Sequence, residues 1–293
     1  MITSEDFTLL QQALPAPSTV QLVSNAFAAG VGQIEYRASG RAGAPVVVLL
    51  HGIGSSSAGY RAQLAGLADE FHVIAWNAPG FGHSTPLASE TPATGDYAQA
   101  LGAFLAALGI RQLAVLVGSS WGSVIAAAFA AHGDVAVPSL VLSAPNTARG
   151  RLQGEARAAE LAGLVRAGAS SDRGAVADRL LTPDTPAEVR AHVERLRDAV
   201  TPRGWRQAAH MLFTAYTPDL LAHRRGRLAI VAGTRDQVAP LEAHGAVLHA
   251  AVPAARLHVL EGLGHMPKLE APARFNAIVR EAARVAERRG NGP

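Results

Sequence analysis

The chain has 293 residues, of which 49% are hydrophobic, enough for one large α/β domain or two small ones. Its net charge is only +3 and nearly all of its basic residues are arginines spread along the chain, so we expect no nucleic-acid partner. Cysteine is absent, which excludes disulfides and cysteine-based metal sites. No apolar run reaches the length of a membrane span, and the first residues are acidic where a signal peptide is basic, so we expect no membrane association and a cytoplasmic location.

Short apolar runs rich in β-branched residues alternate along the chain with longer segments rich in alanine and leucine. Strands are predicted at residues 19–23, 32–37, 45–51, 71–77, 112–118, 139–143, 227–233 and 256–260. Helices are predicted at residues 60–69, 95–108, 121–132, 241–250 and 268–286. Runs that are apolar at every position, such as residues 46–50, are typical of strands buried on both faces. The alternation predicts an α/β fold with a mostly parallel eight-stranded sheet flanked by helices.

One region interrupts this alternation. Residues 146–221 carry no strand signal and consist of helical stretches rich in arginine, alanine and glutamate. They predict a helical cap inserted into a core made of residues 1–145 and 222–287, with a disordered tail at residues 288–293. Because ligands of open α/β sheets bind at the carboxyl ends of the strands, a cap inserted there lies over the binding site.

The most informative motif lies between a predicted strand and a small-residue helix, where residues 118–122 fit G-x-S-x-G with Ser120 at the centre. A serine at so sharp a turn exposes its hydroxyl above the sheet, and glycines are needed on either side because Cβ atoms there would collide. The pattern favours Ser120 as a nucleophile; the alternative is a plain turn of glycine and serine.

A serine hydroxyl needs a base to take its proton, and the base needs an acid to orient it. His265 follows the last predicted strand, and Asp236 follows the strand at residues 227–233. Both positions lie at the carboxyl edge of the sheet with Ser120, so we predict a Ser120–Asp236–His265 triad. For Asp236 an Asx turn or helix cap ahead of Pro240 remains an alternative.

Two backbone amides are expected to stabilise an oxyanion. One is that of Trp121, directly after the nucleophile, and the other is that of Ile53, in the glycine-rich loop after the third strand. The alternative for this loop is a phosphate-binding loop, but neither glycine spacing of such loops is present. We expect no metal and no cofactor.

Together these motifs resemble the α/β-hydrolase superfamily over nearly the whole chain. The matching segments are residues 51–54, 79–84, 118–122, 233–236 and 264–265. The resemblance implies the α/β-hydrolase fold, a cap domain and a serine-hydrolase activity. Asn77 stands where the family often has Asp, and Ser123 where it often has Gly. A serine at position 120 is unlike the aspartate of haloalkane dehalogenases and epoxide hydrolases.

The end of the predicted cap, residues 201–205, is similar to the 3-oxoadipate enol-lactonase branch and to hydrolases that cleave C–C bonds of meta-ring-fission products. We therefore predict a serine hydrolase that cleaves a small ester or lactone through an acyl-enzyme. A C–C bond hydrolase, an acyltransferase and a non-catalytic small-ligand receptor remain alternatives, and the oligomeric state is not predicted. Arg203 and Arg206 are predicted to bind a substrate carboxylate.

Overall fold

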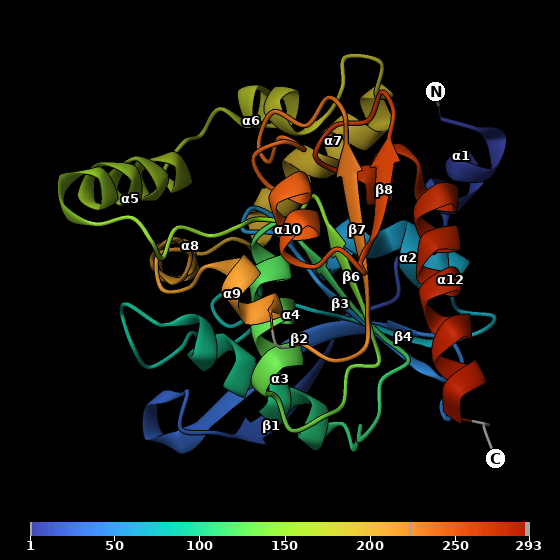
Figure 1. Ribbon diagram of the computed structural model, residues 1–293, viewed down its shortest axis with the longest axis horizontal. Coiled ribbons are helices and arrows are strands. Elements are labelled where there is room, and N and C mark those ends of the chain that lie inside the picture. Colours follow the sequence, from blue (N-terminus) through green and yellow to red (C-terminus); the bar gives the residue numbers. More distant parts are fainter. Residues whose placement is uncertain (1, 223, 291–293) are drawn as a thin grey trace.

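One eight-stranded sheet runs through the molecule, in the order β1-β2-β4-β3-β5-β6-β7-β8 (Figure 1). The computed structural model describes residues 2–222 and 224–290. The strands are β1 (Ser18–Val23), β2 (Val31–Ser39), β3 (Val46–Leu50), β4 (His72–Trp76), β5 (Val115–Ser119), β6 (Ser139–Ser143), β7 (Arg227–Gly233) and β8 (Arg256–Leu260). β2 pairs antiparallel with both of its neighbours, β1 and β4, and the pairings among β3 to β8 are parallel. The predicted fold class and strands are confirmed; the largest shift is at β5, which begins at 115 instead of 112.

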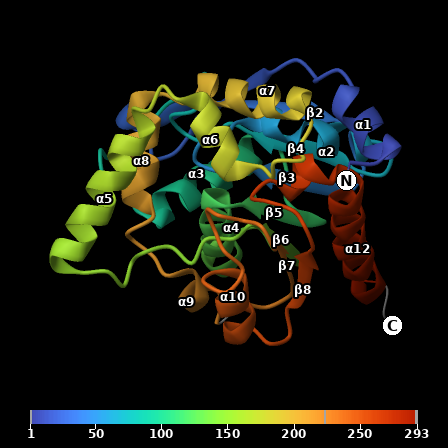
Figure 2. The ribbon, with the colours of Figure 1, turned by 90° about the horizontal axis from the view of Figure 1, so that it is seen from above.

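Helices cover both faces of the sheet (Figure 2). On one face lie α2 (Arg61–Gly66) and α12 (Pro272–Gly290), and on the other lie α3 (Thr94–Ala107), α4 (Trp121–His132) and α10 (Gly245–Ala251). The two faces alternate along β3. Val47 and Leu49 belong to the core under α12, whereas Val48 and Leu50 belong to the core under α4. A strand buried on both faces therefore has to be apolar at every position.

The helix predicted at residues 268–286 is divided into α11 (Pro267–Glu270) and α12. Pro272 is the cause, because proline lacks an amide hydrogen and disfavours helical backbone in the residue before it; Ala271 has φ −149°. A further helix, α1 (Ser4–Gln11), was not predicted; the side chains of Thr3 and Asp6 cap its first turn.

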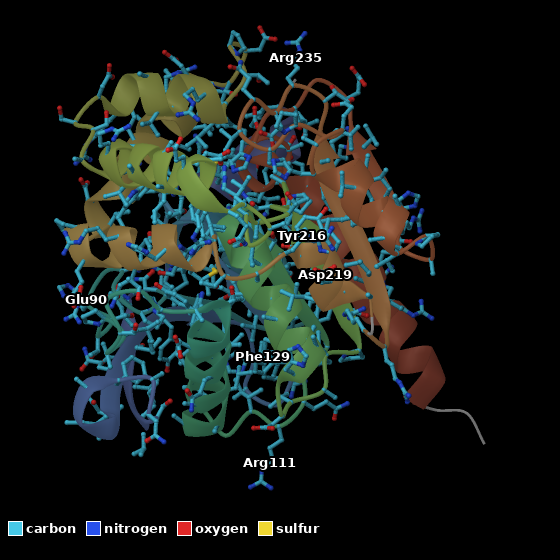
Figure 3. All side chains as sticks on the ribbon, turned by 60° about the vertical axis from the view of Figure 1, so that its left-hand side comes forward. Glu90, Arg111, Phe129, Tyr216, Asp219 and Arg235 are labelled. Carbon is cyan, nitrogen blue, oxygen red and sulfur yellow. The ribbon has the colours of Figure 1, made fainter. Side chains whose placement is uncertain are left out.

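Between β6 and β7 the described residues, 144–222 and 224–226, form helices and irregular segments with one isolated β-bridge, from Val200 to Phe81. This part of the chain contains α5 (Gly154–Gly168), α6 (Arg173–Leu180), α7 (Ala187–Leu196), the short 3-10 helix η3 (Arg197–Ala199), α8 (Pro202–Met211) and α9 (Thr217–Leu221). In Figure 1, α6 and α7 lie at the end of the molecule toward which the arrowheads of β7 and β8 point, which is the end where the carboxyl ends of the strands lie. Figure 3 shows the same polarity, with Arg235 after β7 and Arg111 before β5 at opposite ends of the molecule.

At the other end of the chain, α12 extends to Gly290, so residues 288–290 of the predicted tail have helical backbone, and residues 291–293 lie outside the described residues. Among the described helices, none has both the length and the apolar character that crossing a bilayer requires.

The turn from β5 into α4 brings backbone segments into close contact. Ser120 has φ 53° and ψ −116°, a left-handed backbone that is uncommon for a residue with a side chain. A Cβ on Gly122 would lie 2.5 Å from the carbonyl oxygens of Leu50 and His51. A Cβ on Gly118 would lie 2.5 Å from the carbonyl oxygen of Gly122. Glycine at these two positions allows α4 to start directly against β3.

We expect Gly122→Ala to lower the free energy of unfolding by about 1–3 kcal/mol, because the added methyl group meets fixed backbone oxygens. The matched control is Gly102→Ala within α3, where a Cβ would lie an ordinary 3.6 Å from the ring of Phe129 (labelled in Figure 3). This control should raise stability by about 0.5–1 kcal/mol. Urea unfolding measures both, and equal effects of the two substitutions would contradict the close approach.

Candidate active site

Ser120 lies in the turn between β5 and α4, on the wall of a cavity of about 160 Å³. Its amide donates to the carbonyl oxygen of Ser143 at 2.9 Å, and its own carbonyl accepts from the amide of Ser123 at 2.9 Å. The turn is thereby fixed from β6 and from the first turn of α4. Because α4 begins directly after Ser120, its first amides have no helical acceptor and favour negative charge near the hydroxyl.

His265 and Asp236 are brought together from the loops after β8 and β7. His265 Nδ1 lies 2.8 Å from Asp236 Oδ2 and 3.0 Å from Oδ1, and the Asp236 side chain is completely buried. Oδ1 also accepts hydrogen bonds from the amides of Val238 and Ala239, both at 2.8 Å. Asp236 therefore makes the Asx-type turn that was the alternative and also contacts His265.

The electrostatics of this pair determine which histidine tautomer is present. Burial disfavours the charged carboxylate of Asp236, but its contacts with His265 and with the two amides outweigh burial and lower its pKa. A carboxylate can only accept a hydrogen bond, so His265 Nδ1 carries a proton. In the neutral imidazole, Nε2 then has a free lone pair that can accept a proton.

Ser120 and His265 both line the 160 Å³ cavity, as does Ile53. Within residues 2–222 and 224–290 no hydrogen bond joins Ser120 Oγ to His265. Catalytic contacts of this kind are often long in a site without substrate and shorten when substrate binds. The structure thus places the predicted hydroxyl and imidazole on one cavity wall, with the acid behind the imidazole.

The loop after β3 holds its shape through a buried histidine. His51 Nε2 accepts from the amide of Ala78 at 3.0 Å, so Nδ1 carries the proton and donates to the carbonyl of Gly52 at 2.8 Å. Burial lowers the pKa of His51 to about 4, so this arrangement persists at neutral pH. Gly52 lies directly against the nucleophile, since a Cβ there would be 3.3 Å from Cβ of Ser120.

The two amides predicted to bind an oxyanion belong to Ile53 and Trp121. In the part of the chain that the structure describes, neither amide donates to a protein acceptor, so both can donate to a ligand. The Trp121 side chain points away from the cavity wall, and its indole donates to the carbonyl of Ala208 in α8 at 3.0 Å.

A buried neighbour explains why position 77 is an asparagine, whereas the α/β-hydrolase superfamily often has an aspartate there. Asn77 Oδ1 accepts from the amide of Ser57 at 2.6 Å, and its Nδ2 donates to the carboxylate of Glu35, which is itself buried. An aspartate could not donate to Glu35 and would place a second negative charge beside it. Asparagine therefore joins the end of the loop after β3 to β2.

Two residues of the site were not predicted from the sequence. The first is Lys268, the only lysine of the chain, which lines the cavity with 1% of its surface exposed. Its Nζ donates to Ser119 Oγ at 3.0 Å and lies 4.4 Å from the centre of the Tyr60 ring. No carboxylate pairs with it among the described residues, and burial lowers its pKa to about 7.

The second is Glu270, in α11. One of its oxygens accepts from the amides on either side of His265, those of Gly264 at 3.0 Å and Met266 at 3.2 Å. The other accepts from the amide of Thr182 at 2.9 Å, between α6 and α7. The feature of the sequence that could have indicated Glu270 is the presence of a carboxylate five positions after His265. That segment was predicted only as the start of a helix.

The helices between β6 and β7 supply much of the cavity wall. Their apolar contribution consists of Leu164, Ala167, Val176, Leu180, Val193, Leu196 and Trp205. They also contribute two arginines, Arg179 and Arg197.

The two arginines predicted to bind substrate, Arg203 and Arg206, do not line the cavity. Arg203 forms an ion pair with Glu90 at 2.7 Å, and Arg206 is exposed outside the cavity, so the prediction that these two residues bind substrate is wrong. In α8 the side of Trp205 and Ala208 is buried, and this turns positions 203 and 206 away from the cavity.

A larger hollow of about 970 Å³ lies at the opposite, amino end of the strands. Its wall includes residues 42–46 and 108–114 and none of Ser120, Asp236 or His265. Of these two cavities, the one lined by Ser120 and His265 is therefore the smaller.

Comparison with known proteins identifies the family and the fold of the chain. The family model described as alpha/beta hydrolase fold matches residues 45–272. An uncharacterized protein of Mycobacterium tuberculosis is 31% identical over 263 residues, which cover 80% of this chain and 74% of that protein. An esterase structure from Rhodococcus has a TM-score of 0.74 and 28% identity, covering 91% of this chain and 98% of its own. The enol-lactonase from Burkholderia xenovorans has the same fold, with a TM-score of 0.73, 20% identity and coverage of 85% and 96%.

We expect Lys268→Met to stabilise the protein, and more at pH 6 than at pH 9. Below about pH 7 the lysine is charged in both states, and the folded state bears the full cost of burying the charge. Between pH 7 and 10.5, the ordinary pKa of a lysine, the folded state loses the proton first, so the cost declines as pH rises. The gain at pH 6 is of the order of a few kcal/mol.

Urea unfolding at the two pH values measures this gain. Arg206→Met, at an exposed position, is the control and should change stability by less than about 0.5 kcal/mol. A loss of stability at pH 6, or a gain independent of pH, would show that Lys268 is not buried as an uncompensated charge.

Proposed function

The chain belongs to the alpha/beta hydrolase fold family, and on that premise we propose that it is a serine hydrolase that cleaves a small ester or lactone through an acyl-enzyme. The observation that carries the proposal is the buried Asp236–His265 pair, in which His265 lines the same cavity as Ser120 and Asp236 lies behind it. This pair provides a base with a free Nε2 lone pair on the same wall as a hydroxyl that needs one.

In the first half of the reaction, His265 Nε2 takes the proton of Ser120 Oγ as the oxygen attacks the acyl carbon. The negative charge that forms on the carbonyl oxygen is bound by the amides of Ile53 and Trp121. The imidazolium, stabilised by Asp236, then returns the proton to the departing alcohol. With a lactone the alcohol stays attached to the acyl group, because ring opening releases no second product.

In the second half, a water molecule replaces the alcohol. His265 takes a proton from the water as its oxygen attacks the ester carbon, and gives that proton to Ser120 Oγ when the acid leaves. The net change is the addition of one water to one ester bond. Apart from this water and the substrate, residues of the chain supply every group that moves a proton or binds charge in the two halves.

Residues 146–221 are proposed as a cap over this site, with residues 1–145 and 222–287 as the core. In support, α5 to α8 contribute most of the apolar wall that faces Ser120, and Glu270 joins the His265 loop to the segment between α6 and α7. A cap in this position selects the substrate by shape and excludes bulk water from the acyl-enzyme.

Ser120→Ala should lower kcat for a small ester such as 4-nitrophenyl acetate by about 10⁴-fold or more, because it removes the nucleophile. The fold should be retained, since the Ser120 side chain makes no hydrogen bond in the described structure. Release of 4-nitrophenol measures the rate, and thermal unfolding checks the fold. Parent-like turnover by a folded variant would rule out Ser120 as the nucleophile.

Asp236→Asn should lower kcat by roughly 10³–10⁴-fold. The asparagine carbonyl is needed by the amides of Val238 and Ala239, so its NH₂ group faces His265 Nδ1 and forces the proton onto Nε2. A histidine in that tautomer cannot accept the serine proton. The pH–rate profile, compared with that of Glu261→Gln at an exposed acid after β8, measures the effect. Activity near that of the parent would mean that another acid orients His265.

A further inference from the structure

We propose that the cavity contains an anion subsite, made by Lys268, Ser55 and Arg197, that binds a carboxylate on the acyl part of the substrate. The inference rests on the proposed hydrolase function. It narrows the proposed substrates to monoesters of small dicarboxylic acids, in which one carboxyl group is free and the other is esterified.

Lys268 is the cationic side of this subsite. An ammonium group has three N–H donors, and the one protein acceptor in hydrogen-bond contact is Ser119 Oγ, as far as the described residues extend. The Tyr60 ring lies beside Nζ, and Lys268 is one of the residues that line the cavity. A buried cation without an acid partner costs folding free energy, and an anionic ligand supplies the missing charge.

Ser55 gives an independent indication. It lines the same cavity and is 6% exposed, and its Oγ has no hydrogen-bond partner in the described structure. The hydroxyl oxygen is packed closely against the backbone of Gly59, since a Cβ added to Gly59 would lie only 2.5 Å from it. Buried polar atoms are seldom left unpartnered, and those that are often mark a place where a ligand or water completes the bonding.

The charges around the cavity have one sign. Lys268, Arg179 and Arg197 line it, and no aspartate or glutamate belongs to its described wall. Arg197 stacks on Trp205, with the guanidinium 5.0 Å from the ring centre, and forms no ion pair in the described chain. Among the arginines of the same insertion that lie outside the cavity, some pair with acids, namely Arg149, Arg151, Arg173, Arg190 and Arg203, and others form no ion pair in the described chain, namely Arg157, Arg166, Arg195 and Arg206. What distinguishes Arg197 is its place on the cavity wall.

The position of the subsite limits the length of the acyl group. Lys268 is hydrogen-bonded to Ser119, the residue directly before the proposed nucleophile. A substrate carboxylate bound to Lys268 is therefore separated from the acyl carbon by only a short carbon chain. The remaining wall is mostly apolar and suits a few methylene groups. A short, unbranched acid esterified at its far end fits these conditions.

The test compares monomethyl succinate, which carries one carboxylate, with dimethyl succinate, which is neutral, by following methanol release. The parent should show a kcat/KM for the monoester at least about tenfold higher than for the diester. In Lys268→Met the ratio of the two values should fall by about 10–100-fold, since a charge-assisted contact is lost. In Arg203→Met, which loses an ion pair outside the cavity, the ratio should not change.

If Lys268→Met does not fold, Ser55→Ala and Arg197→Met test the subsite instead. Each of these variants should lower the ratio of kcat/KM for the monoester to kcat/KM for the diester. A parent ratio near one, or a ratio that none of the folded variants lowers, would overturn the subsite while leaving the hydrolase intact. If the parent hydrolyses neither these two esters nor 4-nitrophenyl acetate, the proposed function itself fails.

Discussion

The turn at Ser120 is the constraint on which the rest of the site depends. Its left-handed backbone ends β5 and starts α4 within one residue, and this is sterically possible only because positions 118 and 122 are glycines. The turn aims the hydroxyl at the carboxyl edge of the sheet. Because β3, β5, β7 and β8 are parallel, their following loops reach the same edge, and three of them carry Ile53, Asp236 and His265.

Much of this could be predicted from local sequence. The strands are apolar at every position because both faces of the sheet are covered, and the order of Ser120, Asp236 and His265 follows from strands and turns that can be read one at a time. Contacts between distant parts of the chain could not be predicted in this way. Lys268 meets Ser119 across 149 positions, and Glu270 meets Thr182 across 88. The arginine prediction failed because the rotation of α8 about its axis depends on the packing of Trp205.

The site combines two kinds of electrostatic environment. Around Asp236 every buried charge has its partner, so the carboxylate stays ionised and the histidine tautomer is defined. At Lys268 the reverse holds, because its ammonium group is buried beside the neutral hydroxyl of Ser119 and the aromatic ring of Tyr60. The first environment orients the reacting groups, and the second stores an unfavourable charge that a suitable ligand can relieve.

The most direct test of the account is the isolation of the acyl-enzyme. Parent protein mixed with 4-nitrophenyl acetate and quenched in acid within the first turnover should gain the mass of one acetyl group. Peptide mapping should place that group on Ser120. An acetyl group on Ser119, Ser123 or Lys268, or turnover without any covalent intermediate, would contradict the central claim that Ser120 is the nucleophile.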